Sequence, residues 1–172
     1  TLTTSSAASD VYKRQFNLLN QIQSKRFVMI GNGENEKSMA YVGNVVSFIV
    51  YCLNLNKGIH IFNYIDKPDI NMNQLVKKVR KKLFNKNNIG IRLPKFFGIF
   101  VGIIADIFAK AVNKNLPVSY IRVKKFLSST KFSSSVKDIG FVAPFSLEEG
   151  LDNTIQYEFI DDNKDKITFE TE

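Results

Sequence analysis

Two glycines that follow a short apolar run suggest the first candidate chemistry. In "RFVMIGNGENEKSMAYVGNVV", Gly31-Asn32-Gly33 stands between that run and a second, helix-like apolar stretch. A glycine turn between a strand and a helix can cradle phosphates, because its backbone N–H groups can approach an anion closely. Asn-Gly is equally a strong turn signal for a simple hairpin. The segment therefore predicts either a phosphate site or a hairpin that resembles one.

Other residue types exclude several common kinds of site. His60 is the single histidine and Cys52 the single cysteine, so neither a Ser-His-Asp triad nor a metal cluster of these residues can be assembled. We interpret His60 as a structural residue of a strand. Cys52 lies in an apolar run and excludes an intrachain disulfide, which favours a reducing, cytoplasmic location. Asp66 and Asp69 flank Pro68, and we expect them to cap the next helix rather than act as paired acids.

The net charge of +8 raises nucleic acid or acidic lipid as partners. Much of it comes from "VKKVRKKLFNK", where five basic residues lie at 77, 78 and 80–82. The same helix has an apolar stripe, so the basic residues are expected on its solvated face. We therefore predict no nucleic-acid partner. The stripe consists of Met72, Leu75, Val76, Val79 and Leu83.

Periodicity predicts the elements that must position any site. Residues 16–25 have the spacing of a short amphipathic helix, and 26–31 and 58–65 are strand candidates. A helix is expected from about 45 to 53 and a turn at 66–70. Asn71 with Gln74 predicts a capping box at the start of the basic helix. Ser146 with Glu149 predicts a second capping box, before apolar residues that recur every four positions: Leu147, Leu151, Ile155 and Phe159.

The stretch "LPKFFGIFVGIIADIFAKAV" is unusually apolar. It has no charge from Phe96 to Ala105, and Asp106 and Lys110 then interrupt it. That run is too short to cross a bilayer, which takes about 20 apolar residues. We expect a helix here that ends before Leu116-Pro117.

Composition divides the chain into three parts. Residues 1–15 are Ser/Thr/Ala-rich, and their "DVYKRQ" resembles the translation of a transposon end used to prepare sequencing libraries. We predict that residues 1–15 form a disordered, non-native tail, with natural sequence starting near Phe16. Residues 16–160 form the folded part, and the acidic residues 161–172 are expected to fray. Two predicted strands are too few for a self-sufficient α/β sheet, which indicates half of a larger protein.

Three segments occur in the order typical of one family. "FVMIGNGENEKSMAYVGNVV", "GIHIFNYIDKPDINMNQLV" and "DIGFVAPFSLEEGLDNTI" resemble the C-terminal half of extended short-chain dehydrogenases, the NAD-dependent epimerase/dehydratase family. The resemblance covers nearly all of 16–160. It implies a partial α/β fold: the mostly helical, substrate-binding half of a Rossmann-type enzyme.

The resemblance also implies where the redox chemistry lies. In this family NAD or NADP is bound mainly by the N-terminal half, and hydride transfer uses a Tyr-x-x-x-Lys pair of that half. Here the dinucleotide fingerprint is lacking, because "GNGENE" has no third glycine and no surrounding βαβ unit. Tyr120 and Lys124 have the pair's spacing but follow the glycine turn, whereas the family's pair precedes it. No catalytic or cofactor-binding residue is therefore predicted in this chain, and the chain alone is expected to be inactive.

Substrate contacts are what the resemblance assigns to this half. Backbone of Phe27, Val28 and Met29 would face the uracil of a UDP-sugar. Lys37 occupies the place of a family arginine near the ribose and phosphates, and it lacks the planar fork of arginine. Arg122 matches best a later arginine that grips the pyrophosphate. A homodimer is one assembly that the resemblance allows.

Two alternatives stay open. The first keeps the fold with a sterol- or flavonol-like alcohol as substrate, since Lys37 replaces arginine and "FFGIFVGII" is apolar. The second is a non-catalytic module that binds a polyanion through the lysine-rich helix or a membrane surface through residues 95–112. We favour solvated lysines, and a Phe-rich helix that covers core or a dimer partner.

Overall fold

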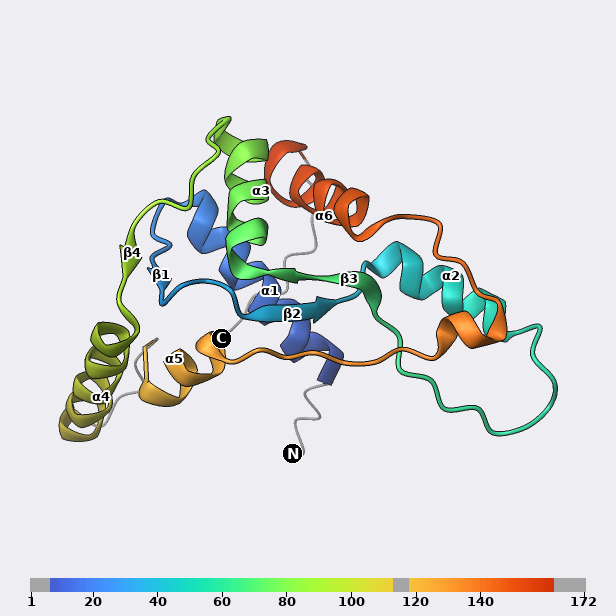
Figure 1. Cartoon of the computed structure of the whole chain (residues 1–172), viewed down its shortest axis with the longest axis horizontal. Helices are drawn as coiled ribbons and strands as arrows, with labels where there is room; N and C mark the ends of the chain where they lie inside the picture. The colour runs from blue at the N-terminus through green and yellow to red at the C-terminus, as the bar shows by residue number, and fades with distance from the viewer. Residues whose placement is uncertain (1–6, 113–117, 163–172) are drawn as a thin grey trace.

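Three helices surround the hydrophobic core. The computed structural model describes residues 7–112 and 118–162, and for residues 7–14 it describes the backbone alone. Helices α1 (Ala7–Gln23), α3 (Met72–Phe84) and α6 (Leu147–Ile155) lie against one another in Figure 1. The apolar stripe of α3 is buried between them, as its spacing predicts. The buried residues of this core are Leu19, Ile22, Phe27, Met29, Met72, Leu75, Val76, Val79 and Ile155.

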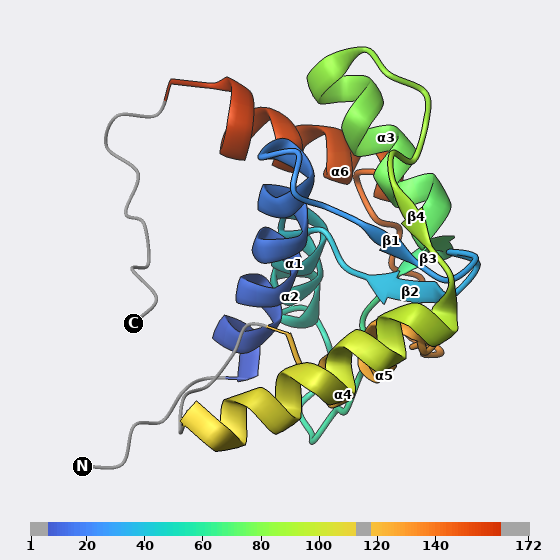
Figure 2. The same ribbon diagram turned by 90° about the vertical axis from the view of Figure 1, so that its left-hand side faces the viewer.

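The strands form two separate pairs. Strand β1 (Met29–Ile30) runs parallel to β4 (Arg92–Leu93), with Met29 opposite Arg92. Strand β2 (Glu36–Met39) runs antiparallel to β3 (Asp66–Asn71), with Lys37 opposite Ile70. Figure 2 shows both pairs beside the helices. Few strands and mostly helix agree with the partial α/β fold that the sequence predicts.

The remaining helices lie at opposite ends of the molecule. Helix α2 (Val42–Cys52) lies at one end of Figure 1, and α4 (Lys95–Val112) and α5 (Tyr120–Leu127) lie together at the other. A 3-10 turn (Val136–Ile139) and a π-helical turn (Gln156–Ile160) complete the described elements. Within these residues no helix is both long enough and apolar enough to cross a membrane.

Both predicted capping boxes are confirmed. The Asn71 side chain accepts a hydrogen bond from the Gln74 N–H at 2.8 Å, and the Gln74 side chain accepts one from the Asn71 N–H at 3.1 Å. Ser146 and Glu149 make the equivalent pair before α6. These reciprocal bonds satisfy N–H groups that the first turn of a helix leaves without a partner. They fix where α3 and α6 begin.

Five sequence predictions are wrong. Residues 7–15 continue α1 instead of forming a disordered tail, since Ala7 and Ala8 favour helix and no Gly or Pro interrupts it. Residues 58–65 form no strand: Ile59 is 94% and Ile61 90% exposed, because strand-forming residues need a neighbouring strand to pair with. The predicted turn at 66–70 is instead part of β3, where β2 supplies that partner. Helix α2 begins at Val42, three residues before its predicted start.

The fifth error concerns the two aspartates before α3. Neither Asp66 nor Asp69 caps that helix, since Asn71 is its N-cap. Asp69 accepts hydrogen bonds from Lys67 and Ser38, and Asp66 is buried elsewhere. The predicted break at Leu116-Pro117 and the end of the acidic tail, residues 163–172, lie outside the described residues.

Candidate functional site

The three segments that carry the family resemblance meet around one buried carboxylate. Asp66 is 4% exposed and accepts hydrogen bonds from the Tyr41 N–H at 2.7 Å, the Asn44 Nδ2 at 2.9 Å and the Tyr64 hydroxyl at 2.7 Å. Tyr41 is the N-cap residue of α2. A buried carboxylate needs such donors, because an ion without them would not tolerate removal from water. Asp66 thus ties β3 to the start of α2.

Asn44 extends this network to the third segment. It is fully buried at 0% exposure, and its Nδ2 donates to the Phe145 carbonyl at 2.9 Å. The Phe145 N–H donates back to the Asn44 Oδ1 at 3.0 Å. The ring of Phe145 also packs edge-on against Tyr41, with 5.4 Å between ring centroids. Asn44 therefore fixes the chain just before α6 against α2. The sequence analysis did not predict this role, although an Asn within an apolar helix can indicate a buried polar contact.

Tyr64 is held as a proton donor in this network. Burial, together with the hydrogen bond to Asp66, raises the pKa of the Tyr64 phenol well above its ordinary value. A protonated phenol can donate to the carboxylate throughout the physiological range. Aromatic rings of Phe48 and Phe141 pack against Tyr64 at centroid distances of 5.2 and 6.0 Å. The network is therefore a scaffold whose hydrogen bonds are directed inward.

The glycine turn is a structural connection and offers no phosphate cradle at the adjacent helix. Gly31 and Gly33 have φ angles of +78° and +70°, which side chains rarely tolerate. The Gly33 carbonyl accepts the Asn73 N–H at 3.0 Å, and the Asn35 carbonyl accepts the Met72 N–H at 3.2 Å. These N–H groups belong to the first turn of α3, where an anion would have to bind. The described residues at this turn thus do not fit the pyrophosphate of a dinucleotide.

Backbone of the predicted substrate strand is partly engaged inside the protein. The Met29 N–H donates to the Ile91 carbonyl at 2.9 Å, and the Phe27 N–H donates to the Gln21 carbonyl at 3.0 Å. The side chains of Phe27 and Met29 are buried in the core, as expected, and Val28 is half-buried. A ligand at this strand could therefore contact only the backbone groups that β4 and α1 do not engage, which lie around Val28.

The Lys37 side chain, predicted to contact a ligand, makes hydrogen bonds within the protein. Its ammonium donates to the Ser128 carbonyl at 2.5 Å, the Lys125 carbonyl at 3.2 Å and the Thr130 hydroxyl at 3.4 Å. Burial lowers the pKa of Lys37. A cation beside the last carbonyls of a helix is favourable, because the helix dipole is negative there. Lys37 therefore holds the C-terminus of α5. The sequence could not reveal this contact, because Lys37 and Ser128 are 91 residues apart in the chain.

Arg122 and the predicted strand come close through α5. The Asn35 Nδ2 donates to the Phe126 carbonyl at 2.7 Å, and the Phe126 ring lies 6.3 Å from that of Phe27. Arg122 is exposed on the same helix, and its N–H donates to the Ser119 hydroxyl at the N-cap. The elements predicted to face a substrate therefore lie side by side, whereas the Lys37 side chain is directed into the contact between them.

Tyr120, Lys124 and His60, to which the sequence assigns no catalytic role, make local contacts. The Lys124 ammonium lies over the Tyr120 ring, 6.0 Å from its centroid. His60 is exposed in the 57–65 loop, where its Nε2 lies 2.8 Å from the Asn56 carbonyl. No cluster of three or more His, Cys, Asp or Glu among the described residues could hold a metal ion.

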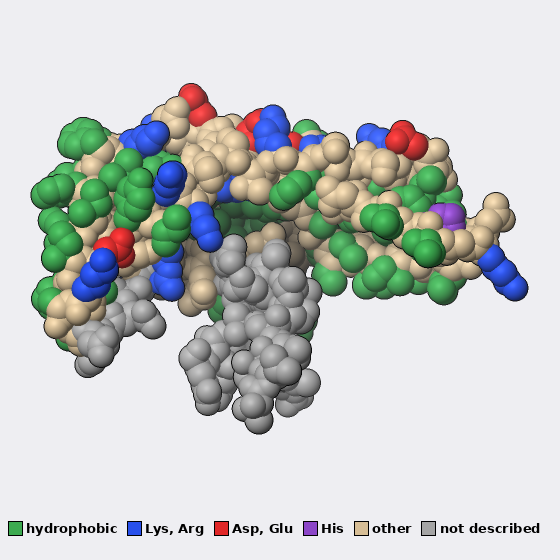
Figure 3. All heavy atoms as spheres, turned by 90° about the horizontal axis from the view of Figure 1, so that it is seen from below, with side chains coloured by type: hydrophobic (Ala, Val, Ile, Leu, Met, Phe, Trp, Pro, Cys, Tyr) green, Lys and Arg blue, Asp and Glu red, His purple; other side chains and the backbone are tan. Residues whose placement is uncertain are grey.

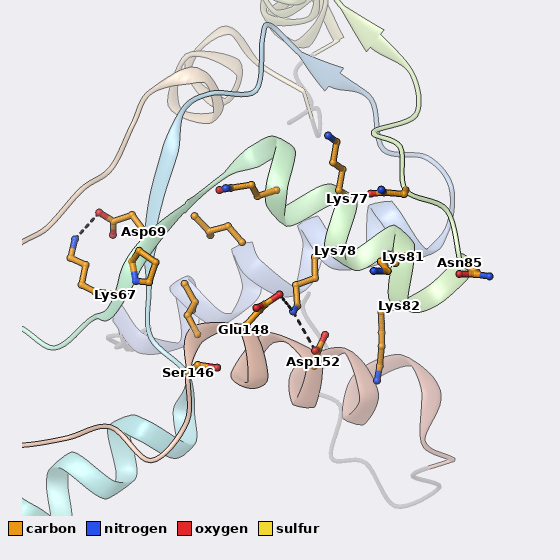
Figure 4. A pocket seen from close by; sticks show the side chains of 15 residues that line it. Lys67, Asp69, Lys77, Lys78, Lys81, Lys82, Asn85, Ser146, Glu148 and Asp152 are labelled. Atoms are coloured by element: carbon orange, nitrogen blue, oxygen red, sulfur yellow. Dashed lines mark hydrogen bonds and ion pairs between the residues drawn. The ribbon is translucent and has the colours of Figure 1, made fainter.

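The basic helix borders an open groove of about 870 Å³ between α3, β3 and α6. Figure 4 shows Lys78 directed at two carboxylates of α6, Glu148 at 2.6 Å and Asp152 at 3.3 Å. Lys77 and Lys82 have no ion-pair partner among the residues that the structure describes. This mixture of paired and solvated lysines is typical of an exposed helix face and gives no geometry specific to a polyanion.

Comparisons with known proteins support the resemblance in part. No family model matches the chain. The chain is 50% identical over 159 residues, 91% of its length, to an Escherichia coli O157:H7 protein called N-acetyl-alpha-D-glucosaminyl-diphospho-ditrans,octacis-undecaprenol 4-epimerase. The chain spans 48%, about half, of the length of this relative. It is thus similar to part of an epimerase.

Proposed function

We propose that this chain is the C-terminal, substrate-binding half of an NAD(P)-dependent epimerase that acts on a hexosamine joined through a diphosphate to a polyprenol. The observation that carries the proposal is the 50% identity over 159 residues with an epimerase whose name states such a substrate. A UDP-sugar, predicted from the sequence, presents the same sugar diphosphate and stays the alternative substrate.

The exposed face of α2 supports the proposal that a further part of the protein packs here. Its large apolar residues recur at helical spacing, and each is more than half exposed, although α2 has no charged residue to solvate that face. A protein rarely leaves such a stripe in water. In our proposal the nucleotide-binding half covers it and supplies the cofactor site and the catalytic pair. The stripe consists of Val42, Val46, Ile49, Val50 and Leu53.

Substrate binding in this half is assigned to the end of β1 and to α5. Arg122 would bind the diphosphate, since a guanidinium can form two parallel hydrogen bonds to phosphate oxygens. The accessible backbone near Val28 would line the neighbouring part of the site. Lys37 contributes indirectly, because it holds α5 in place.

The test uses the intact protein, with this chain joined to its nucleotide-binding half. It is incubated with NAD and either N-acetylglucosaminyl-diphospho-undecaprenol or UDP-N-acetylglucosamine, and the sugar is released by mild acid and analysed for the C4 epimer. We expect the epimer from the lipid-linked sugar. Epimerisation of the UDP-sugar alone would refute the polyprenol substrate, and no epimer from either would refute the proposed activity.

A variant tests the assigned contact. Arg122→Gln should raise KM about tenfold or more with a smaller change in kcat, because it removes charge-assisted hydrogen bonds to the diphosphate. Lys82→Gln, which removes a solvated charge of the α3 groove, is the matched control and should leave KM unchanged. Equal KM values for the two variants would show that Arg122 does not bind the diphosphate.

A further inference from the structure

Helix α4 contacts the rest of the protein through glycines and leaves its large apolar residues outside. A Cβ on Gly98 would lie 2.4 Å from the Ile30 Cγ2, and one on Gly102 would lie 2.9 Å from the Tyr120 Cα. These are the two buried residues of α4. Ordinary amphipathic helices bury their bulky apolar side and expose small or polar residues, and α4 does the reverse.

The outward face of α4 is apolar along almost the whole helix. Two adjacent rows at helical spacing form it, and they contain no charged residue. At 1.5 Å per residue, the 18 residues of α4 extend about 27 Å. We call this surface the α4 face; its exposed residues are Phe96, Phe97, Phe100, Val101, Ile103, Ile104, Ile107 and Phe108. We expected this helix to cover core or a dimer partner; among the described residues its outward face covers no core, and the dimer partner stays a prediction.

Most charged residues of α4 and its neighbour α5 are basic. Helices α4 and α5 contain one acidic residue, Asp106, whose carboxylate accepts the N–H of Tyr120, the first residue of α5, at 3.0 Å. Figure 3 shows hydrophobic side chains gathered over the end formed by α4 and α5, with Lys and Arg among them. The basic residues of these two helices are Lys95, Lys110, Arg122, Lys124 and Lys125. The exposed apolar stripe of α2, by contrast, lies on a helix without any charge.

We propose that the α4 face lies in the surface of an anionic lipid bilayer, with α4 parallel to the membrane plane and the basic residues at the phosphate headgroups. An apolar face with a cationic border is the combination that holds a helix in the interface of an anionic membrane. A protein partner would match the uncharged stripe of α2 better than these mostly basic helices.

The place of α4 connects this docking to the proposed substrate, so the inference rests on the proposed function. Gly98 seats α4 directly on Ile30 of β1, and Gly102 seats it on the start of α5. A polyprenol substrate keeps its chain in the bilayer and its diphosphate at the surface. With α4 in that surface, the end of β1 and Arg122 stand at the level of the diphosphate.

The test measures flotation of the 172-residue chain with vesicles that contain no sugar-linked polyprenol. Vesicles of phosphatidylethanolamine with phosphatidylglycerol should carry the chain upward, and vesicles of neutral phosphatidylcholine should carry much less. The variant Phe100→Ser/Ile104→Ser changes side chains of the α4 face that are 59% and 50% exposed. The matched control Val46→Ser/Ile49→Ser changes α2 side chains that are 53% and 58% exposed. Circular dichroism checks that each variant remains folded.

We expect the α4 variant to lower the partition coefficient roughly tenfold to a hundredfold, and the α2 control to leave it within about twofold. Lys124→Gln/Lys125→Gln should lower binding to anionic vesicles roughly twentyfold and leave binding to neutral vesicles unchanged. Flotation of the α4 variant at the original level would overturn the proposal. An equal loss in the α2 control would also overturn it, since the binding would then be general stickiness.

Failure of docking and failure of the proposed function give different results. Vesicle binding through α4 by an intact protein that epimerises no sugar diphosphate would leave the docking in place and refute the activity. Epimerisation of the lipid-linked sugar by an intact protein whose α4 variant floats normally would refute the docking alone.

Discussion

Removal of the Asp66 carboxylate should destabilise the fold more than any other single change at an acidic residue that the structure describes. In Asp66→Ala, the Tyr41 N–H and the Asn44 Nδ2 lose a buried acceptor, and the Tyr64 hydroxyl loses its partner. Each buried donor without an acceptor costs about 1–3 kcal/mol. Asn44 keeps its bond to Phe145, so we expect a loss of about 3–5 kcal/mol, out of the roughly 5–15 kcal/mol typical of a domain.

Two milder variants separate charge from shape. Asp66→Asn keeps the volume but directs an NH2 group at one of the donors, and it should cost about 2–3 kcal/mol. Tyr64→Phe removes a single donor and should cost about 1 kcal/mol. Because the two side chains share one hydrogen bond, their effects should not add in the double variant.

Urea unfolding followed by far-UV circular dichroism measures these losses, and the exposed Asp138 provides the control. Asp138→Asn should stay within about 0.5 kcal/mol of the unchanged chain. If Asp66→Asn unfolds at the same urea concentration as Asp138→Asn, then the carboxylate does not join α2 to β3, and our account of the three segments is wrong.

Three further predictions concern α5, α3 and acid stability. Lys37→Met should lower the free energy of unfolding by about 2 kcal/mol and speed hydrogen exchange in α5, because it removes the ammonium from the carbonyls at the helix end. The control Lys82→Met should change neither quantity. Equal effects of the two variants would refute this role of Lys37. Asn71→Ala should cost about 1 kcal/mol in urea unfolding through loss of the α3 capping box, and an unchanged midpoint would count against the cap. The hydrogen bond from Lys67, followed by that from Ser38, holds the pKa of Asp69 below its ordinary 3.8, so its stabilisation is complete above that value and lost as pH falls through the folded pKa. A pH series of unfolding midpoints should therefore be flatter below pH ~4 for Asp69→Asn, and an unchanged slope would contradict the prediction.

Elements fixed by nearby residues could be predicted from the sequence. The two capping boxes each need residues three positions apart, and the stripe of α3 needs only helical spacing. Both signals are local, so one sequence contains them. The strand predicted at 58–65 fails for the opposite reason. Ile59 and Ile61 favour a strand, but a strand also needs a partner, and partners are set by the whole fold.

The roles of individual polar residues were harder to predict. Lys37 was placed by motif position near a ligand, yet its contacts at α5 are 88 to 93 residues away in the chain. Asn44 lies 101 residues from Phe145, and no periodicity connects them. Such pairs follow from packing between segments, which one sequence without homologues does not record.

The shared motifs lie in the scaffold of the protein, so their presence alone does not indicate which carrier the substrate sugar has. The motifs are joined by hydrogen bonds among Tyr41, Asn44, Asp66 and Phe145. They therefore specify how α2, β3 and the start of α6 are held together. A chain could keep all of them with any sugar carrier. What differs between a nucleotide and a polyprenol carrier is the surface that must receive it. Helix α4 presents an apolar surface, contacts β1 through Gly98, and together with α5 contains five basic residues. In our proposal the lipid-linked substrate rests on the sequence identity with the epimerase, and the apolar face that the glycines leave outside on α4 adds an argument that the shared motifs do not give.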